Sequence, residues 1–303
     1  MAMAKANFED ILDPTFERIM DEEYNQHPDM IPEFYDMVPH NGREDMKWSG
    51  ISTLQNFQQF VGTVQMQEQA QMYDVTATYL PWTNGFELER ELIDDDQYNI
   101  WEGKPRALAA SAYRTRQTHG ARMFNRAFSV DTLFYNNTEG TALCSNSHTT
   151  TTGASTASGF DNLVTTAMSA TAVASARIQM TQFRGTQAEI IQTMPNALLF
   201  APGDYERAFE IVNSTNKLDT ANNNANVHQG RYSLFEWNFL SDANNWFMMD
   251  MTRLKQDLKW VDRIELEYGF AEDFLTFVAM YRAYMRYANA WCDWRGILGA
   301  QVS

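Results

Sequence analysis

Two side chains of this sequence, Cys144 and His148, lie four positions apart and could form a nucleophile and its general base. A thiol attacks a carbonyl carbon once a neighbouring imidazole has accepted its proton. The pair belongs to a stretch that runs into a Ser/Thr/Gly/Ala tract at 145–158, and no third catalytic member is evident there. A plain loop is the favoured interpretation, and a hydrolase that uses Cys144 and His148 is kept as a remote alternative.

Metal and cofactor chemistry has little support in the sequence. Glu89, Glu91 and the acidic run 94–96 could bind a hard cation. A solvated acidic patch, or one that contacts another subunit, is the favoured interpretation. The five histidines are scattered without zinc-ligand spacing, and the sequence has no nucleophile elbow, phosphate-binding glycine loop or dinucleotide fingerprint. We therefore expect no metal, no cofactor and no enzymatic activity.

A basic stretch at 104–128 offers binding chemistry instead. Its six cations are Lys104, Arg106, Arg114, Arg116, Arg122 and Arg126, and it contains no acid. Apolar residues recur at three- and four-residue spacing from Leu108 to Phe128, which predicts one long amphipathic helix with Pro105 in its first turn. Because no acid compensates the arginines within the helix, a partner must do so. That partner is another part of the chain, another copy of it, or an outside molecule.

The rest of the chain is acidic. Its net charge is −16, of which residues 1–101 carry −15, residues 102–128 carry +5 and residues 129–303 carry −6. An acidic protein is not expected to coat nucleic acid tightly, because phosphates repel it. No apolar run is long enough for a membrane helix, and the first ten residues do not read as a secretory signal. The two cysteines are expected to be free thiols in a reducing compartment.

The first third of the chain is expected to consist of an arm and a β-rich segment. Residues 1–47 are polar, acidic and rich in proline, which predicts a terminal arm that lies on another surface. Alternating patterns at 61–67, 73–79 and 86–92, with an Asn-Gly turn signal at Asn84 and Gly85, predict a β-hairpin within 48–101. Such a ribbon has little core of its own, so it either packs on its own domain or reaches across to a neighbour.

The second half reads as a mixed α+β domain. A helix is expected from about 160 to 183, a buried strand at 196–201, and a further helix from Pro202. Residues 216–230 are rich in asparagine and predict a surface loop. Extended segments are expected at 232–239, 246–251, 261–270 and 275–288. The apolar C-terminal end is expected to be tied into a sheet.

Several motifs, in order, resemble the major capsid proteins of tailed bacteriophages, close to the Mu-like prophage head subunits. The matching segments cover roughly residues 90–300 and are Asp94-Asp95-Asp96-Gln97, Leu143-Cys144-Ser145, Leu198-Leu199-Phe200-Ala201-Pro202, Phe235-Glu236-Trp237-Asn238, Trp246-Phe247-Met248 and Asp293-Trp294-Arg295-Gly296. The resemblance implies the Hong Kong 97-type shell fold. It divides the chain into an N-terminal arm (1–47), an extended loop (48–101), a peripheral domain (102–159 with spine helix 104–128, and return strands 251–288) and an axial domain (160–250 and 289–303).

The function implied by this resemblance is structural. Copies of the chain would form the hexamers and pentamers of an icosahedral shell around double-stranded DNA, assembled in the host bacterial cytoplasm and ending in the virion. A portal, a separate scaffolding protein and a decoration or cement protein are expected partners, with weak non-specific DNA contact and no membrane. An encapsulin-like nanocompartment shell is the alternative from a nearby class.

Charge predicts where the copies would meet. The acidic residues expected to lie over a neighbour are Glu87, Glu89, Glu91, Asp94, Asp95 and Asp96. The arginines expected to receive them are Arg114, Arg116, Arg122 and Arg126. Contact between these arginines and packaged DNA is a secondary possibility for any that remain uncovered.

Overall fold

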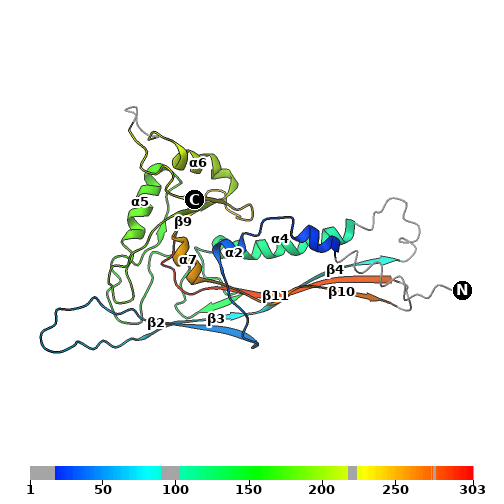
Figure 1. Cartoon of the computed structure of the whole chain (residues 1–303), viewed down its shortest axis with the longest axis horizontal. Helices are drawn as coiled ribbons and strands as arrows, with labels where there is room; N and C mark the ends of the chain where they lie inside the picture. Colours follow the sequence, from blue (N-terminus) through cyan, green and yellow to red (C-terminus); the bar gives the residue numbers. More distant parts are fainter. Residues whose placement is uncertain (1–17, 90–102, 218–223, 274, 276–277, 303) are drawn as a thin grey trace.

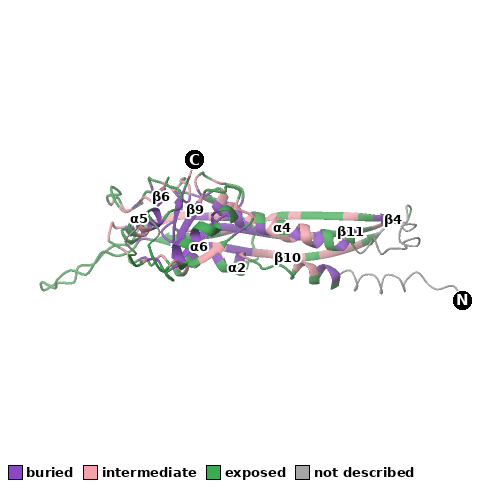
Figure 2. Cartoon of the chain, turned by 90° about the horizontal axis from the view of Figure 1, so that it is seen from above, coloured by how far each residue is buried: buried purple, intermediate pink, exposed green. Residues whose placement is uncertain are grey.

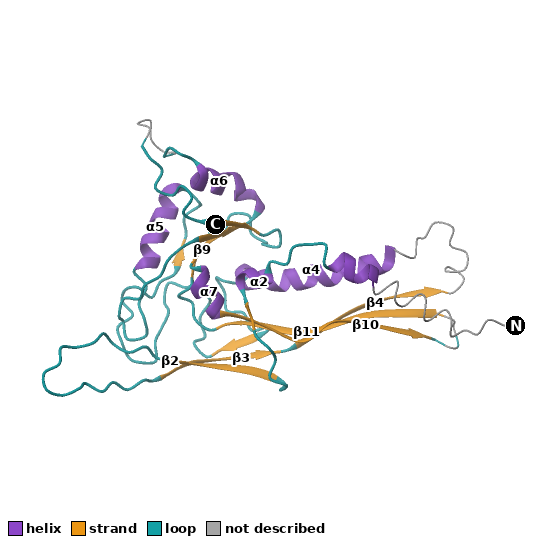
Figure 3. Ribbon diagram, in the orientation of Figure 1, coloured by secondary structure: helices purple, strands orange, loops and turns teal. Residues whose placement is uncertain are grey.

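The molecule is elongated, with a long sheet and one long helix forming an arm and a second sheet lying in a compact region at one end (Figure 1). It is a computed structural model that describes residues 18–89, 103–217, 224–273, 275 and 278–302. The loop at 52–70 projects from the end of the molecule opposite to the free end of the arm (Figure 3). Helices lie against the sheets without a regular β–α alternation, as the predicted α+β class requires.

The long sheet has the strand order β1-β10-β11-β4. Its members are β1 (Asp36–Met37), β10 (Leu258–Glu272), β11 (Val278–Trp291) and β4 (Leu80–Glu89). β11 runs antiparallel to both β10 and β4, so the two predicted extended segments of the C-terminal half are confirmed as one long hairpin. Tyr281, Ala283, Met285 and Tyr287 alternate with more exposed residues and are buried, which gives the sheet one apolar face.

The predicted basic helix is α4 (Gly103–Asn125), and it packs against β11 and β4 of the long sheet. Pro105 lies in its first turn, and Leu108, Ala112 and Phe124 are buried along the predicted apolar stripe. Gly120 allows a close approach, because a Cβ there would lie 2.9 Å from Cγ1 of Ile31. The apolar stripe of α4 therefore packs against the apolar face of the long sheet, as its spacing predicts.

The latter part of the predicted terminal arm packs into the subunit's own core. α2 (Ile31–Phe34) precedes β1, and the side chain of Phe34 is fully buried. Its ring stacks on Trp237, with centroids 5.4 Å apart, and meets Phe124 edge-on at 5.6 Å. The hydroxyl of Tyr35 donates a 2.7 Å hydrogen bond to the carbonyl of Gly120. This segment thus joins α4 to the compact region.

The compact region is built on a five-stranded sheet in the order β6-β12-β9-β7-β8. The strands are β6 (Leu163–Val164), β12 (Ile297–Ala300), β9 (Trp246–Met249), β7 (Ala197–Phe200) and β8 (Ser233–Glu236). Every residue of β7, β9 and β12 is buried. The C-terminal segment is therefore tied into the middle of a sheet, as predicted.

Helices flank this sheet and connect it to the arm. α5 (Ala170–Thr181) and α6 (Tyr205–Asn213) belong to the compact region, and a 3-10 turn, η2 (Pro202–Asp204), leads into α6. α7 (Met251–Asp257) connects β9 to β10. The helix expected from about 160 begins later, because Leu163 and Val164 first pair with Gly299 and Ala300 as β6.

A third sheet, in the order β2-β3-β5, corrects the predicted hairpin. It contains β2 (Asp45–Ile51), β3 (Gln71–Thr78) and β5 (Tyr135–Asn137). Residues 52–70 connect β2 to β3 as a long loop, so the strand predicted at 61–67 is wrong.

The Asn-Gly turn is also wrong. Asn84 and Gly85 lie inside β4, where Gly85 pairs with Arg282. A Cβ at Gly85 would lie 2.6 Å from the carbonyl oxygen of Tyr281, so the glycine serves a close strand contact. Residues 48–101 consequently do not form one hairpin, since their described second half belongs to the long sheet.

The position of Phe34 predicts a large loss of stability on truncation. Phe34→Ala removes a fully buried ring and should lower the free energy of unfolding of the unassembled subunit by about 3–5 kcal/mol. Denaturant unfolding followed by circular dichroism measures the loss. Phe57→Ala is the matched control, because the same substitution at a fully exposed ring should change stability by less than about 0.5 kcal/mol. Similar losses in both variants would contradict the proposed core.

Candidate intersubunit surfaces

The loop at 52–70 carries the most conspicuous uncovered surface of the described chain, and Figure 2 shows it exposed along its length. Its exposed apolar residues are Leu54, Phe57, Phe60, Val61, Val64 and Met66. Phe57 is 100% exposed and Met66 is 90% exposed. The loop contains a single charged residue, Glu68. Several exposed apolar side chains gathered on one loop are typical of a surface that contacts another protein.

The base of this loop is held by hydrogen bonds. The backbone N–H of Ser52 donates to the carbonyl of Ala70, and the N–H of Ala70 donates to the Ser52 hydroxyl, both at 2.9 Å. The backbone N–H of Thr53 donates to the hydroxyl of Thr186 at 2.8 Å, which ties the loop to the segment after α5. The loop is thus anchored at its root while its apolar tip remains in solvent.

Two of the four predicted receptor arginines have partners within the subunit. Arg116 donates two hydrogen bonds to the carboxylate of Asp262 on β10, at 2.7 and 2.8 Å, and lies 5.0 Å over the ring of Trp260. Arg122 donates to Asp131 at 2.7 and 2.8 Å. Bidentate pairs of this kind are strong and directional. These two side chains lock α4 to its surroundings.

The other two predicted receptor arginines lie on the surface of the subunit. Arg114 and Arg126 are exposed, and neither forms an ion pair with another described residue. On the acidic side, Glu87 and Glu89 are exposed on β4. The remaining predicted acids, Glu91, Asp94, Asp95 and Asp96, lie outside the described residues.

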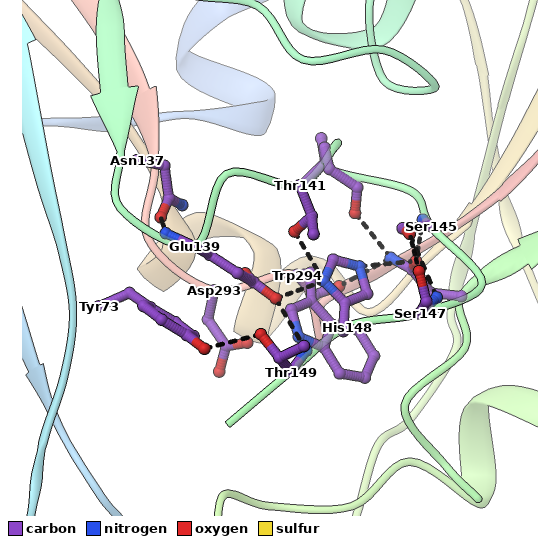
Figure 4. Close-up of polar contacts among 12 residues, drawn as sticks. Tyr73, Asn137, Glu139, Thr141, Ser145, Ser147, His148, Thr149, Asp293 and Trp294 are labelled. Carbon is purple, nitrogen blue, oxygen red and sulfur yellow. Dashed lines mark hydrogen bonds and ion pairs between the residues drawn. The ribbon is translucent and has the colours of Figure 1, made fainter. Parts of the chain in front are cut away.

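Of the predicted catalytic pair, His148 lies in a buried polar cluster at the start of the Ser/Thr/Gly/Ala tract 145–158 (Figure 4), whereas Cys144 belongs to the hydrophobic core. Nδ1 of His148 lies 2.9 Å from Oε1 of Glu139, and Nε2 lies 3.1 Å from Oδ1 of Asn162. The imidazole stacks on Trp294 at 4.3 Å with an interplanar angle of 7°. Nδ2 of Asn162 donates to the carbonyls of Leu143 and Ile297, at 2.9 and 3.1 Å. Through these bonds Asn162 joins the segment before the tract 145–158 to β12 of the compact sheet.

This geometry corrects the hydrolase alternative. Cys144 is fully buried, and burial raises the pKa of its thiol well above the ordinary value, so the nucleophilic thiolate is disfavoured. The Cys144 side chain packs against Gly299, where an added Cβ would lie only 2.7 Å from the cysteine Sγ. Both nitrogens of His148 face Glu139 and Asn162. Cys144 and His148 therefore serve packing and positioning roles in this structure.

The residues that sequence reasoning missed are those of the loop tip and its root. The alternating pattern at 61–67 predicted a strand. The signal that could have indicated an exposed contact loop was the near absence of charge across 52–70 together with its repeated glutamines. Asn162 carried no signal, because the four backbone partners of its side chain lie 17 to 135 residues away in the sequence.

The described part of the chain contains neither a candidate metal site nor a candidate membrane-spanning helix. No group of three or more His, Cys, Asp or Glu residues there could hold a metal ion. Across those same ranges, no helix combines the length and the apolar character that crossing a bilayer requires.

The family model described as phage capsid protein matches residues 74–300. No curated protein sequence matches the chain.

Three solved structures share the fold at low sequence identity. The virus-like particle from Pyrococcus furiosus is 8% identical, with a TM-score of 0.56 over 96% of this chain and 99% of that chain. The capsid of the native GTA particle is 11% identical, with a TM-score of 0.56 over 91% of both chains. The mature capsid of bacteriophage PhiM1 is 9% identical, with a TM-score of 0.58 over 92% of this chain and 88% of that chain. At such identities the likeness establishes the architecture.

The buried cluster generates a stability prediction. Asn162→Ala leaves the carbonyls of Leu143 and Ile297 and the N–H of Ser145 without this partner, and it should lower the unfolding free energy by about 2–4 kcal/mol. Asn244→Ala, at an exposed asparagine of the compact region, is the control and should stay within about 0.5 kcal/mol. Thermal and denaturant unfolding of both variants measure the difference. Equal stability of the two would show that the cluster is not structural.

Proposed function

Because the chain belongs to the phage capsid protein family, we propose that its copies assemble as hexamers and pentamers of an icosahedral shell around the double-stranded DNA of a tailed phage. The chain is a major capsid protein and has the Hong Kong 97-type fold. The particular resemblance to Mu-like head subunits stays a prediction. The role is structural, and its functional sites are the surfaces through which copies meet.

The two regions of the structure take the two roles that the shell requires. We assign the long sheet and α4 to the peripheral domain, and the compact sheet with α5 and α6 to the axial domain at the five- and six-fold axes. The loop at 52–70, rather than all of 48–101, is the extended loop that overlaps a neighbour. The elongated outline and the segregation of the two sheets support this division (Figure 1).

The observation that carries the proposal is the uncovered loop. Phe57, Phe60 and Met66 are 100%, 70% and 90% exposed in the isolated subunit. A phenylalanine side chain loses about 1.5–3 kcal/mol of favourable burial when it remains in water. Docking on a second copy recovers that free energy at every repeat of the shell. With one charge in the loop, this contact is apolar and amide in character rather than an ion-pair contact.

Electrostatics play a separate part. Arg114 and Arg126 remain the proposed receptors for acidic residues of sister subunits, of which Glu87 and Glu89 are described and exposed. An exposed pair contributes about 0–1 kcal/mol on its own. Repetition around a capsomer makes such pairs effective in selecting the register of association.

The expected partners beyond the chain itself remain proposals. A portal, a separate scaffolding protein, a decoration or cement protein and weakly bound DNA complete the particle that we propose. The capsid family places the protein in the virion, and assembly in the host bacterial cytoplasm is the proposed route.

A cellular nanocompartment is the second candidate of the same architecture. The fold is shared both with the virus-like particle from Pyrococcus furiosus and with phage capsids, and the family model favours the phage capsid. The content of native particles separates them. Packaged DNA supports the phage capsid, and a protein cargo supports the nanocompartment.

Electron microscopy of the purified protein tests shell formation and the role of the loop together. The complete chain should form regular hollow particles. A variant in which residues 54–66 are replaced by a short Gly/Ser linker should remain folded, because the hydrogen bonds at Ser52, Thr53 and Ala70 are retained, and should fail to form them. Circular dichroism and thermal unfolding confirm folding of the variant. A complete chain that stays monomeric in conditions that preserve its fold would overturn the proposal.

Charge exchange tests the electrostatic contact. Arg114→Glu combined with Arg126→Glu should lower the yield of particles at low salt by about fivefold or more, and the loss should shrink at high salt. Addition of Glu87→Lys and Glu89→Lys should restore the yield if these acids are the partners. Lys255→Glu, an exposed reversal on α7, is the control. A quadruple variant that assembles no better than the double variant would exclude this pairing.

A further inference from the structure

The orientation of the Asn162 amide determines which nitrogen of His148 carries a hydrogen. Nδ2 of Asn162 donates to the carbonyls of Leu143 and Ile297, at 2.9 and 3.1 Å. Its Oδ1 accepts the backbone N–H of Ser145 at 2.8 Å. A flipped amide would set an oxygen against two carbonyls and a nitrogen against an N–H, so Oδ1 is the atom that faces His148. Because this oxygen only accepts, Nε2 of His148, 3.1 Å away, carries a hydrogen and donates it.

The opposite nitrogen of the ring then requires a second hydrogen. Nδ1 of His148 lies 2.9 Å from Oε1 of Glu139, and the same oxygen accepts the backbone N–H of Thr149 at 3.2 Å (Figure 4). A neutral imidazole with its hydrogen on Nε2 presents a lone pair at Nδ1, and an ionised carboxylate presents only lone pairs. Two facing lone pairs form no hydrogen bond. One proton therefore lies between Nδ1 and Oε1, on the imidazole or on the carboxyl group.

Burial makes this proton matter to the folded subunit. The side chain of His148 is fully buried, and that of Glu139 is 4% exposed. Water is therefore nearly excluded from the pair, and a carboxylate that faced the Nδ1 lone pair would lose its hydration without gaining a donor from the imidazole. The imidazole stacks on Trp294, with ring centroids 4.3 Å apart. An indole face attracts a cation, which favours the proton on the imidazole.

The other titratable groups around the imidazole are engaged elsewhere. Arg295 lies 4.7 Å over the ring of Trp294 and donates to Asp293 at 2.8 Å. The hydroxyl of Tyr73 on β3 is hydrogen-bonded to that of Thr149 at 2.7 Å. The thiol of Cys144 packs against Gly299. Glu139 is consequently the acid that His148 contacts.

The pair lies on a bridge between two sheets. Glu139 follows β5 of the third sheet, and its backbone N–H donates to Oδ1 of Asn137 on that strand at 3.0 Å. Asn162 directly precedes β6 and donates to the carbonyl of Ile297 on β12. Hydrogen bonds from Glu139 through His148 to Asn162 therefore connect the third sheet to the compact sheet.

We propose that a single proton shared between Nδ1 of His148 and Oε1 of Glu139 makes this bridge pH-dependent, so that the bridge weakens as pH rises. In an unfolded chain a histidine is neutral above about pH 6.5 and a glutamate is ionised above about pH 4.3. The folded subunit thus holds one proton more than the unfolded chain at neutral pH. Stability falls with rising pH wherever the folded state binds more protons. The inference concerns the single subunit and does not depend on assembly.

The substitution Glu139→Gln tests the proton requirement. A glutamine amide can donate to Nδ1 without a titrating proton, and the exposed N–H of Thr149 then turns to water. Denaturant unfolding of the unassembled subunit is measured at pH 6.5 and pH 8.5. One bound proton changes the unfolding equilibrium constant by up to about tenfold per pH unit. Over this interval the constant of the wild-type chain should therefore rise about tenfold or more beyond that of Glu139→Gln.

A matched control uses the same substitution at an exposed carboxylate. Glu236→Gln, on β8, should change with pH as the wild-type chain does. If the wild-type chain and Glu139→Gln change by the same factor between the two pH values, the proposal is overturned.

Nuclear magnetic resonance of the wild-type subunit locates the proton without relying on a variant that must fold. With ¹⁵N-labelled histidine at pH 8, His148 should show a hydrogen on Nε2 and a second, far-downfield proton on the Nδ1 side. Exposed histidines carry a single exchanging ring proton at this pH. The signals that disappear in His148→Gln assign the residue. A His148 ring with a hydrogen on Nε2 alone and no second proton would overturn the proposal, whatever the unfolding data show.

Discussion

The packing of α4 across the apolar face of the long sheet is the contact on which the rest of the structure depends. β11 presents Tyr281, Ala283, Met285 and Tyr287 on one face, and α4 covers it. A ribbon of a few strands is marginal in water until such a face is covered. The bidentate pair between Arg116 and Asp262 then fixes the helix in rotation and along the sheet. This pair therefore helps to set which residues of α4 face outward.

The compact region and the loop at 52–70 differ in how far their apolar side chains are covered. The core of the compact region is covered within the subunit, because every residue of β7, β9 and β12 is buried. The loop at 52–70 has no such cover, although its root is fastened by Ser52, Thr53 and Thr186. A loop with a fixed root and an exposed apolar tip is suited to intermolecular contact. The root holds the tip in place, and the tip becomes buried only when a partner covers it. Capsid function, as shown by the family, gives this arrangement its reason.

Local patterns succeeded where the structure is governed by local geometry, and failed where distant pairing competes. The apolar stripe of α4 and the long extended segments of β10 and β11 were predictable because they repeat at helix and strand periods. Asn84 and Gly85 gave a local turn signal, but pairing with β11 across nearly two hundred residues of sequence keeps them in a strand. The loop at 52–70 alternates like a strand and yet pairs with no described strand. For the candidate surfaces, composition identified the basic helix and missed the uncovered apolar tip.

The sequence by itself determined the α+β class, the long basic helix, the tied C-terminal strand and the uneven charge, because periodicity and composition act over a few turns or strands of chain. Only the tertiary structure decided which arginines are free. Arg116 meets a partner 146 residues away, whereas Arg114 and Arg126 stay in solvent. It likewise decided that Cys144 is buried in packing. Burial and pairing depend on residues that are remote in sequence, and no local pattern encodes where those residues meet.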